Sequence, residues 1–101
     1  MANDVTVTIS MLVKPDKLET LLSMIPDLLK ETFSRPGVIS VRALRNPDES
    51  LRLMFLDVFA SIEASNAYFG WRRDRGDLDR LVSMLSEPPR IEVWPVSIGP
   101  V

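Results

Sequence analysis

The chain has 101 residues, of which 46% are hydrophobic and 26% are charged, and its formal net charge is −2 at pH 7. These values fit one domain (residues 1–101) with a hydrophobic core, and they give no electrostatic case for binding nucleic acid or an anionic membrane. Cysteine and histidine are both absent, which excludes disulfides, thiolate metal sites and a Ser-His-Asp triad.

The first third of the chain predicts a strand followed by a long helix. Apolar and polar residues alternate from Val5 to Val13, as in a strand with one buried face. Pro15 suits the first turn of a helix. Pro26 lies on the outer side of this helix, so we expect a kink there rather than a break. Apolar residues recur along it at helical spacing, at Leu18, Leu21, Leu22, Ile25, Leu29 and Phe33.

Two further strands, Val38 to Arg45 and Leu51 to Phe59, should form a hairpin, because the segment Asn46 to Ser50 between them has the composition of a turn. Alternate residues of the third strand point to opposite faces of the sheet. One face carries Leu53, Phe55, Asp57 and Phe59, and the other carries Met54, Leu56 and Val58. Because both faces are largely apolar, we expect both to be covered.

Two helices are predicted after the hairpin. Ser61 is a good N-cap for the first of them, which should run to about Trp71. We expect Arg72 to Asp77 to be a charged connection. Leu78 to Leu85 then predicts a short last helix.

Arg90 to Ile98 predicts a fourth strand, and Pro95 within it indicates an edge position or a bulge. The order β-α-β-β-α-β predicts an α+β, ferredoxin-like fold with a four-stranded antiparallel sheet. Right-handed crossovers would place every helix on one face of that sheet. Since no element remains to cover the other face, we expect a homodimer whose sheets pack face to face. A monomer with a partly exposed sheet face is the alternative.

The helix that follows the hairpin carries a candidate site. On a helical wheel of residues 62–73, Tyr68 lies in the middle of the arc expected to face the sheet. Ser65 and Arg72 share that arc, and Trp71 lies at its edge. These residues predict a small apolar cavity with polar contacts from Tyr68 and Arg72. Its aromatic walls would be Phe55, Phe59 and Trp71. In the alternative, Tyr68 and Trp71 only pack and Arg72 is solvated.

Asp57 is a second candidate, because it is a carboxyl group among apolar neighbours on a strand. Burial would raise its pKa, and such a carboxylate can act as a general base. The alternatives are a buried ion pair with Arg42 or Arg52, or a contact in a dimer interface.

Several short motifs follow one another along nearly the whole chain, and their order and spacing resemble the antibiotic biosynthesis monooxygenase family of dimeric α/β-barrel proteins. Two positions differ from that family's pattern, since Phe59 stands at its usual tryptophan and Tyr68 at a common histidine. Haem-degrading members of the same superfamily use a histidine ligand, so the sequence speaks against haem. The motifs are Lys14-Pro15-Asp16-Lys17, Arg35-Pro36-Gly37-Val38, Arg45-Asn46-Pro47-Asp48, Asp57-Val58-Phe59-Ala60-Ser61 and Glu87-Pro88-Pro89.

The resemblance implies oxidation of a phenol, hydroquinone or anthrone to a quinone by dioxygen, without a cofactor or a metal. In such chemistry the substrate anion itself reduces dioxygen, and the protein favours that anion and excludes water. Tyr68 would hydrogen-bond a substrate oxygen, Arg72 would stabilise the phenolate, and Asp57 would be the base. The residues that would bind the aromatic substrate are Phe55, Phe59, Ser65 and Trp71.

Three other functions stay open at this point. The first is a non-catalytic dimer that binds a small molecule. The second is another barrel enzyme, such as a polyketide cyclase or lactone isomerase, which needs an acid or base but no oxygen. The third is a purely structural or interaction module. We expect a cytoplasmic protein, because the sequence shows neither a secretion signal nor an apolar stretch long enough to span a bilayer.

Overall fold

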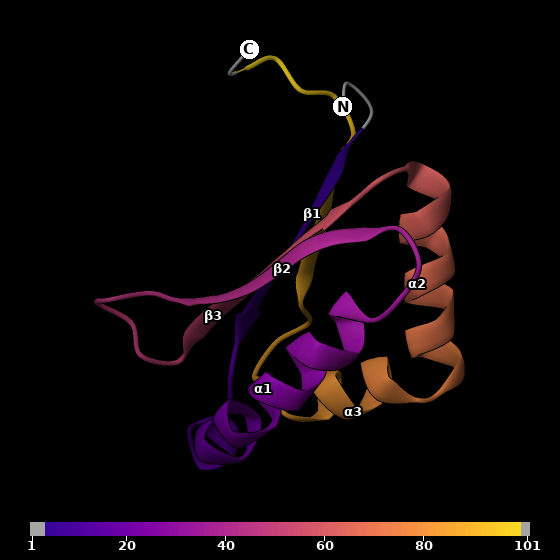
Figure 1. The fold of residues 1–101 in the computed structure, drawn as a ribbon. Coiled ribbons are helices and arrows are strands. Elements are labelled where there is room, and N and C mark those ends of the chain that lie inside the picture. Colours follow the sequence, from indigo (N-terminus) through magenta and orange to yellow (C-terminus); the bar gives the residue numbers. More distant parts are fainter. Residues whose placement is uncertain (1–3, 100–101) are drawn as a thin grey trace.

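The computed structural model of the protein describes residues 4–99 and has the predicted ferredoxin-like order (Figure 1). A single 3₁₀ turn, η1 (Pro15–Lys17), precedes the first helix. The other elements are β1 (Val5–Leu12), α1 (Leu18–Phe33), β2 (Val38–Arg45), β3 (Arg52–Phe59), α2 (Ile62–Asp74), α3 (Asp77–Ser83) and β4 (Arg90–Trp94).

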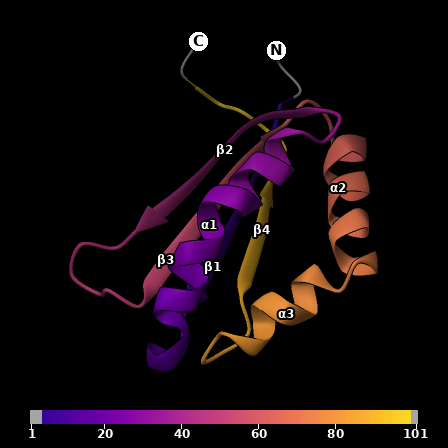
Figure 2. The same cartoon turned by 60° about the horizontal axis from the view of Figure 1, so that its bottom comes forward.

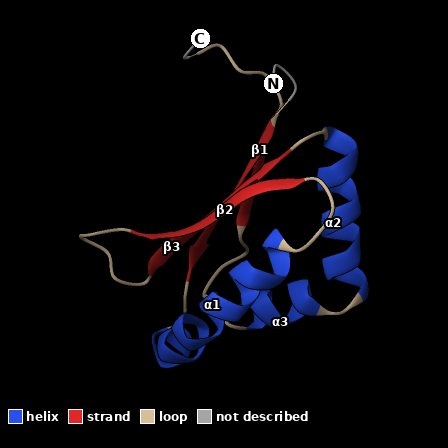
Figure 3. Ribbon diagram, in the orientation of Figure 1, coloured by secondary structure: helices blue, strands red, loops and turns tan. Residues whose placement is uncertain are grey.

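The four strands form one antiparallel sheet in the order β2-β3-β1-β4. All three helices lie on one face of it (Figures 2 and 3), as right-handed crossovers require. The expected edge position of β4 is confirmed by this order. Of the helices in residues 4–99, none has the length and apolar character needed to cross a membrane.

Strand register places the core between the two central strands and the helices. Val7 pairs with Asp57 and Ile9 pairs with Phe55, and all four side chains are buried on the helix side of the sheet. Burial is weaker toward the β4 edge, where Ile91 is 47% exposed. The cover of helices is therefore most complete over β1 and β3.

Helix α1 turns a slightly different face to the core than the sequence predicted. Phe33 was expected inside but is 60% exposed, whereas Thr32 is buried. The inward face contains Leu21, Leu28 and Thr32, which are seven and four residues apart, that is, about two turns and one turn of the helix. The helix runs unbroken through Pro26, which lies on the exposed side.

Two expectations for the C-terminal part are wrong. Helix α2 continues to Asp74, so Arg72 is a buried helical residue and not part of a charged connection. The fourth strand ends at Trp94 rather than Ile98, because Pro95 has no N–H with which to continue the ladder. Ser61 caps α2 as expected, since its Oγ accepts a hydrogen bond of 3.0 Å from the Ala64 N–H.

The sheet face opposite the helices has no covering element among residues 4–99. In its middle, β3 presents Met54, Leu56 and Val58, which are partly buried. Their neighbours in β1 are Thr6, Thr8 and Ser10, so this face combines an apolar stripe with a hydroxyl-rich one.

Gly37 joins α1 to β2 at a point of close contact with α2. Its φ is +79°, a left-handed conformation that favours glycine, and a Cβ added there would lie 2.5 Å from the Cβ of Ala64. Gly76 has a similar φ of +81°, but no heavy atom lies within 4 Å of its hypothetical Cβ. An alanine at either position would strain the backbone, but only at position 37 would it also contact another side chain.

We predict that Gly37→Ala lowers the free energy of unfolding by about 2–4 kcal/mol, because overpacking against Ala64 adds to the strain of a left-handed alanine. The matched control Gly76→Ala should lose only about 1 kcal/mol from backbone conformation. Chemical denaturation measures both. Equal losses in the two variants would contradict the close packing of α2 against this turn.

Candidate active site

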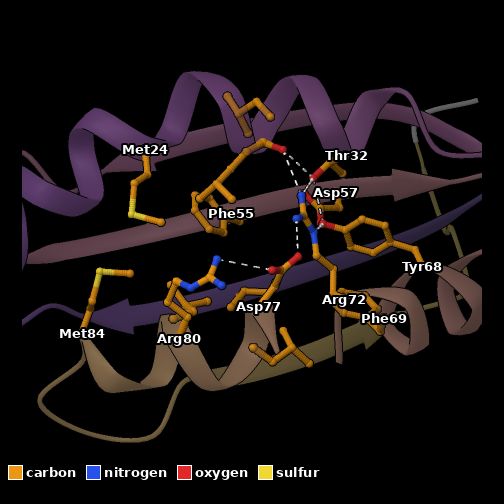
Figure 4. Close-up of a pocket in the computed structure, with 15 residues that line it drawn as sticks. Met24, Thr32, Phe55, Asp57, Tyr68, Phe69, Arg72, Asp77, Arg80 and Met84 are labelled. Atoms are coloured by element: carbon orange, nitrogen blue, oxygen red, sulfur yellow. Dashed lines mark hydrogen bonds and ion pairs between the residues drawn. The ribbon is translucent and has the colours of Figure 1, made fainter. Parts of the chain in front are cut away.

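A cavity of about 60 Å³ lies between the sheet and the helices α1, α2 and α3. Its walls are mostly apolar, and Met24 of α1 and Met84 at the end of α3 face each other at one side (Figure 4). Six polar or charged residues also line it, namely Thr32, Asp57, Tyr68, Arg72, Asp77 and Arg80. Such a small apolar space with few polar groups is typical of a ligand site.

Asp57 is the acidic group that β3 directs into this cavity. Its side chain is 4% exposed, and among residues 4–99 no hydrogen bond reaches its carboxylate. Burial raises the pKa of Asp57 from 3.8 to about 6, although the positive charge of Arg72 lowers it. Arg42 and Arg52 lie on the opposite face of the sheet, paired with the outward residues Leu56 and Leu12, so the alternative of an ion pair between Asp57 and either of them is excluded.

Arg72 is saturated by hydrogen bonds within the protein. Its guanidinium has five N–H groups, and its acceptors are also five: Tyr68 Oη at 2.9 Å, Glu31 Oε1 at 2.9 Å, Asp77 Oδ2 at 2.8 Å, the Leu28 carbonyl at 3.2 Å and Thr32 Oγ1 at 3.2 Å. Burial alone would lower the pKa of Arg72, but its bonds to Tyr68, Asp77 and Glu31 outweigh that effect and raise it. Arg72 is therefore a permanent buried cation.

The hydrogen bonds of Tyr68 have a defined direction. Thr32 Oγ1 donates to the Leu28 carbonyl at 2.9 Å, so the Tyr68 hydroxyl donates its own proton to Thr32 Oγ1 at 2.8 Å. The same hydroxyl accepts from Arg72 Nε. Burial raises the pKa of Tyr68, while the hydrogen bonds with Thr32 and Arg72 oppose the rise. Tyr68 thus stays a neutral donor held in one orientation.

The predicted site residues divide into two groups. Phe55, Asp57, Tyr68 and Arg72 line the cavity together. Phe59, Ser65 and Trp71 do not line it. Phe59 and Ser65 are buried in the core. The centre of the Phe59 ring lies 5.5 Å from that of the Tyr68 ring, so Phe59 packs behind a side chain that lines the cavity.

Outside the cavity, three arginine side chains pack against the indole ring of Trp71. The guanidinium carbons of Arg35, Arg75 and Arg72 lie 4.2, 4.6 and 4.8 Å from the centre of its indole ring. Each is within the range of a cation–π interaction. The indole thereby fixes the end of α2 against the turn that follows α1.

Sequence reasoning missed four residues of this site. Thr32 and Glu31 bind Arg72 from α1, Asp77 binds it from the first turn of α3, and Arg80 reaches the cavity from the same helix. One signal was available for Thr32, since it continues the Leu21 and Leu28 spacing as a polar residue on an apolar face. For the others, only the packing of α3 against α1 reveals the contact.

Comparison with known proteins identifies the family. The family model "Antibiotic biosynthesis monooxygenase" matches residues 4–81. The chain belongs to the antibiotic biosynthesis monooxygenase family. The expected resemblance is thereby confirmed, while no functionally curated protein matches the sequence.

Solved structures share the fold of this family member. A conserved protein from Methanosarcina mazei Go1 has a TM-score of 0.86 at 16% identity, covering 95% of both chains. The structure of Rv0793 from Mycobacterium tuberculosis has a TM-score of 0.80 at 17% identity, covering 97% of this chain and 95% of that one. A solved antibiotic biosynthesis monooxygenase has a TM-score of 0.81 at 10% identity, covering 92% and 98%. These likenesses establish the ferredoxin-like fold.

The raised pKa of Asp57 predicts a specific dependence of stability on pH. Between pH 3.8 and about 6 the native carboxyl holds a proton that the unfolded chain has released, so stability falls as pH rises through this range. We expect the free energy of unfolding to fall by about 2 kcal/mol from Asp57 alone between about pH 4.5 and pH 8.

Asp57→Asn should remove this decrease, and denaturation curves at the two pH values measure it. The exposed loop variant Asp48→Asn is the matched control and should keep the wild-type dependence. An unchanged pH dependence in Asp57→Asn would show that the Asp57 carboxyl titrates normally in the native protein.

Proposed function

We propose that the protein is a cofactor-independent monooxygenase that oxidises an electron-rich aromatic, such as a phenol, hydroquinone or anthrone, to a quinone. The observation that carries the proposal is the Asp57 carboxyl, which lies in an apolar cavity without a hydrogen bond from residues 4–99 and has a pKa of about 6. A base with that pKa is largely ionised at neutral pH and is close to the optimum for proton transfer. Membership of the family supports the reaction type.

The reaction balances with groups that the site and the substrates supply when a phenol or anthrone has a C–H para to its hydroxyl. A hydroquinone would react in the same way at an ortho C–H and give a hydroxyquinone. Asp57 accepts the proton of a phenol hydroxyl, and the phenolate passes electrons to dioxygen as its para carbon forms a C–O bond. Asp57 returns the proton to the outer oxygen of the resulting peroxide. The O–O bond then breaks as the para C–H proton leaves, which gives the quinone carbonyl and one water. Four electrons leave the substrate and reduce both oxygen atoms.

Arg72 and Tyr68 support this chemistry through charge and position. The positive charge of Arg72 stabilises an anion near Asp57, as its effect on the Asp57 pKa indicates, and the same field would favour a phenolate. Arg72 acts without giving up a bond, because all five of its N–H groups are engaged. Tyr68 would reach a substrate oxygen by exchanging its bond to Thr32.

An aromatic substrate requires the cavity to expand. Its volume of about 60 Å³ is smaller than the roughly 150 Å³ that accommodates benzene in a protein interior. Met24 and Met84 flank the cavity (Figure 4), and unbranched methionine side chains rearrange at low cost. In this proposal they move aside when the ring enters and close over it, which excludes water from the reacting carbon.

We also propose that a second copy of the chain covers the open face of the sheet. Met54, Leu56 and Val58 form an apolar stripe along β3. Leu44 of β2 lies beside it at 39% exposure, and Trp94 of β4 lies on the other side of the hydroxyl-rich row of β1 at 53% exposure. An apolar surface of this kind is typical of a protein interface. The homodimer would leave each cavity within one protomer, on the helix side.

Oxygen uptake tests the proposed activity. We expect the purified protein, without added metal or flavin, to consume dioxygen above the autoxidation rate with members of a panel of naphthols, dihydroxynaphthalenes and anthrones, and to form the quinone. Asp57→Asn should lower kcat by about 100-fold or more, as expected for loss of a general base. The exposed α3 variant Asp79→Asn is the control, and the wild-type rate should rise with pH through about 6.

Wild-type turnover in Asp57→Asn would contradict the assigned base. A panel of ligands that raise the melting temperature without oxygen uptake would contradict the monooxygenase and favour a small-molecule-binding dimer. Product formation that persists without oxygen would instead favour a cyclase or isomerase.

A further inference from the structure

Two arginines line the cavity, and only one has donors to offer a ligand. Every N–H of Arg72 already donates to a group of the protein. Arg80 lines the same cavity, yet within residues 4–99 its guanidinium makes no hydrogen bond. Its nearest charged partner is Asp77, whose Oδ1 lies 3.6 Å from Arg80 Nη1, and its side chain is 61% exposed. Arg80 is therefore the available cation of this pocket.

Asp77 holds Arg80 weakly because three guanidiniums share its carboxylate. Its Oδ2 lies 2.8 Å from Arg72 Nη1 and 3.4 Å from Arg75 Nε, whereas its contact with Arg80 is longer than a hydrogen bond. If Arg80 turns to a ligand, Asp77 keeps its buried partner Arg72. Recruiting Arg80 thus leaves no buried charge unpaired, and it would not disturb the bonds that hold the helices.

Arg80 and Asp57 reach the cavity from different walls. Asp57 comes from β3, Arg80 comes from α3, which lies below β3 in the view of Figure 4, and Phe55 lies between Asp57 and the two methionines. A flat ring in the expanded cavity would therefore meet a proton acceptor at one position and a cation at another. A substrate complementary to this arrangement has an ionisable hydroxyl and a separate anionic group.

We propose that Arg80 is a specificity-determining residue and that the preferred substrate is a hydroxyaryl carboxylate, with the carboxylate paired to Arg80. This inference rests on the proposed function, whose substrate class it narrows. A carboxylate matches the planar fork of a guanidinium, which can donate two parallel hydrogen bonds to it. The negative substituent also places the ring so that its hydroxyl faces the β3 wall that carries Asp57.

Binding under anaerobic conditions tests this inference separately from catalysis. Isothermal titration calorimetry compares a dihydroxynaphthoate with the dihydroxynaphthalene that lacks only the carboxylate. Wild-type protein should bind the carboxylate about 10- to 100-fold more tightly, as expected for charge-assisted hydrogen bonds. Arg80→Gln should remove this preference and leave the affinity for the uncharged ligand unchanged, which also shows that the variant is folded.

The matched control is Arg73→Gln, which removes an exposed arginine of α2 that does not line the cavity, and it should keep the wild-type preference. An equal affinity of wild-type protein for both ligands, no binding of either ligand, or a preference retained in Arg80→Gln would each overturn the role of Arg80. Preference for the carboxylate without oxygen uptake would support Arg80 and overturn the monooxygenase. Oxygen uptake with the uncharged ligand, together with equal affinity of the protein for both ligands, would support the monooxygenase and overturn the role of Arg80.

Discussion

The buried guanidinium of Arg72 is the contact on which the arrangement of the three helices depends. It lies on α2, takes acceptors from α1 through Leu28, Glu31 and Thr32, and takes another from α3 through Asp77. A cation that is 4% exposed is stable only because every donor is satisfied. Removal of one charged partner from such a buried pair costs about 3–5 kcal/mol. The helices are thereby held at the spacing that leaves a cavity above β3.

Because every donor of Arg72 is engaged, the residues of the pocket have different roles. Arg72 supplies a fixed positive charge but no free donor, and Tyr68 is oriented by Arg72 and Thr32. Asp57 lies close enough to Arg72 for the charge to lower its pKa, yet burial keeps that pKa at about 6. The structural cation therefore tunes the acid–base group without bonding to it. In this way a site without histidine can contain a proton acceptor whose pKa is close to neutral pH.

Much of the fold follows from local sequence patterns. Alternation in β1 and β3 predicted which residues face the helices, including Asp57, because a strand has a side-chain period of two. The Ser61 cap and the turn at Asn46 were likewise predictable from their own side chains, since Asn46 Oδ1 accepts the backbone N–H groups of Asp48 and Glu49. These features depend on residues near one another in the chain.

Contacts between elements that are far apart in the sequence could not be predicted from it. The helical wheel placed Arg72 on the inward arc, but its acceptors on α1 and α3 are set by packing and not by spacing in the sequence. Phe59 and Trp71 seemed suitable walls as aromatic residues, yet Phe59 lies in the core and Trp71 stacks against arginines. Arg80 is the available cation of the pocket only because every donor of Arg72 is engaged by the protein. A cavity depends on the distance between elements, which no periodicity encodes.

A carbon-13 NMR titration of the Asp57 side-chain carboxyl in the folded protein tests most directly whether Asp57 is the proton acceptor of the pocket. We expect a midpoint of about 6, because the carboxyl is buried without a hydrogen bond from residues 4–99 while Arg72 limits the rise. A midpoint at the ordinary value of 3.8 would contradict this role, since the Asp57 carboxyl would then be solvated or paired and the pocket would lack its proton acceptor.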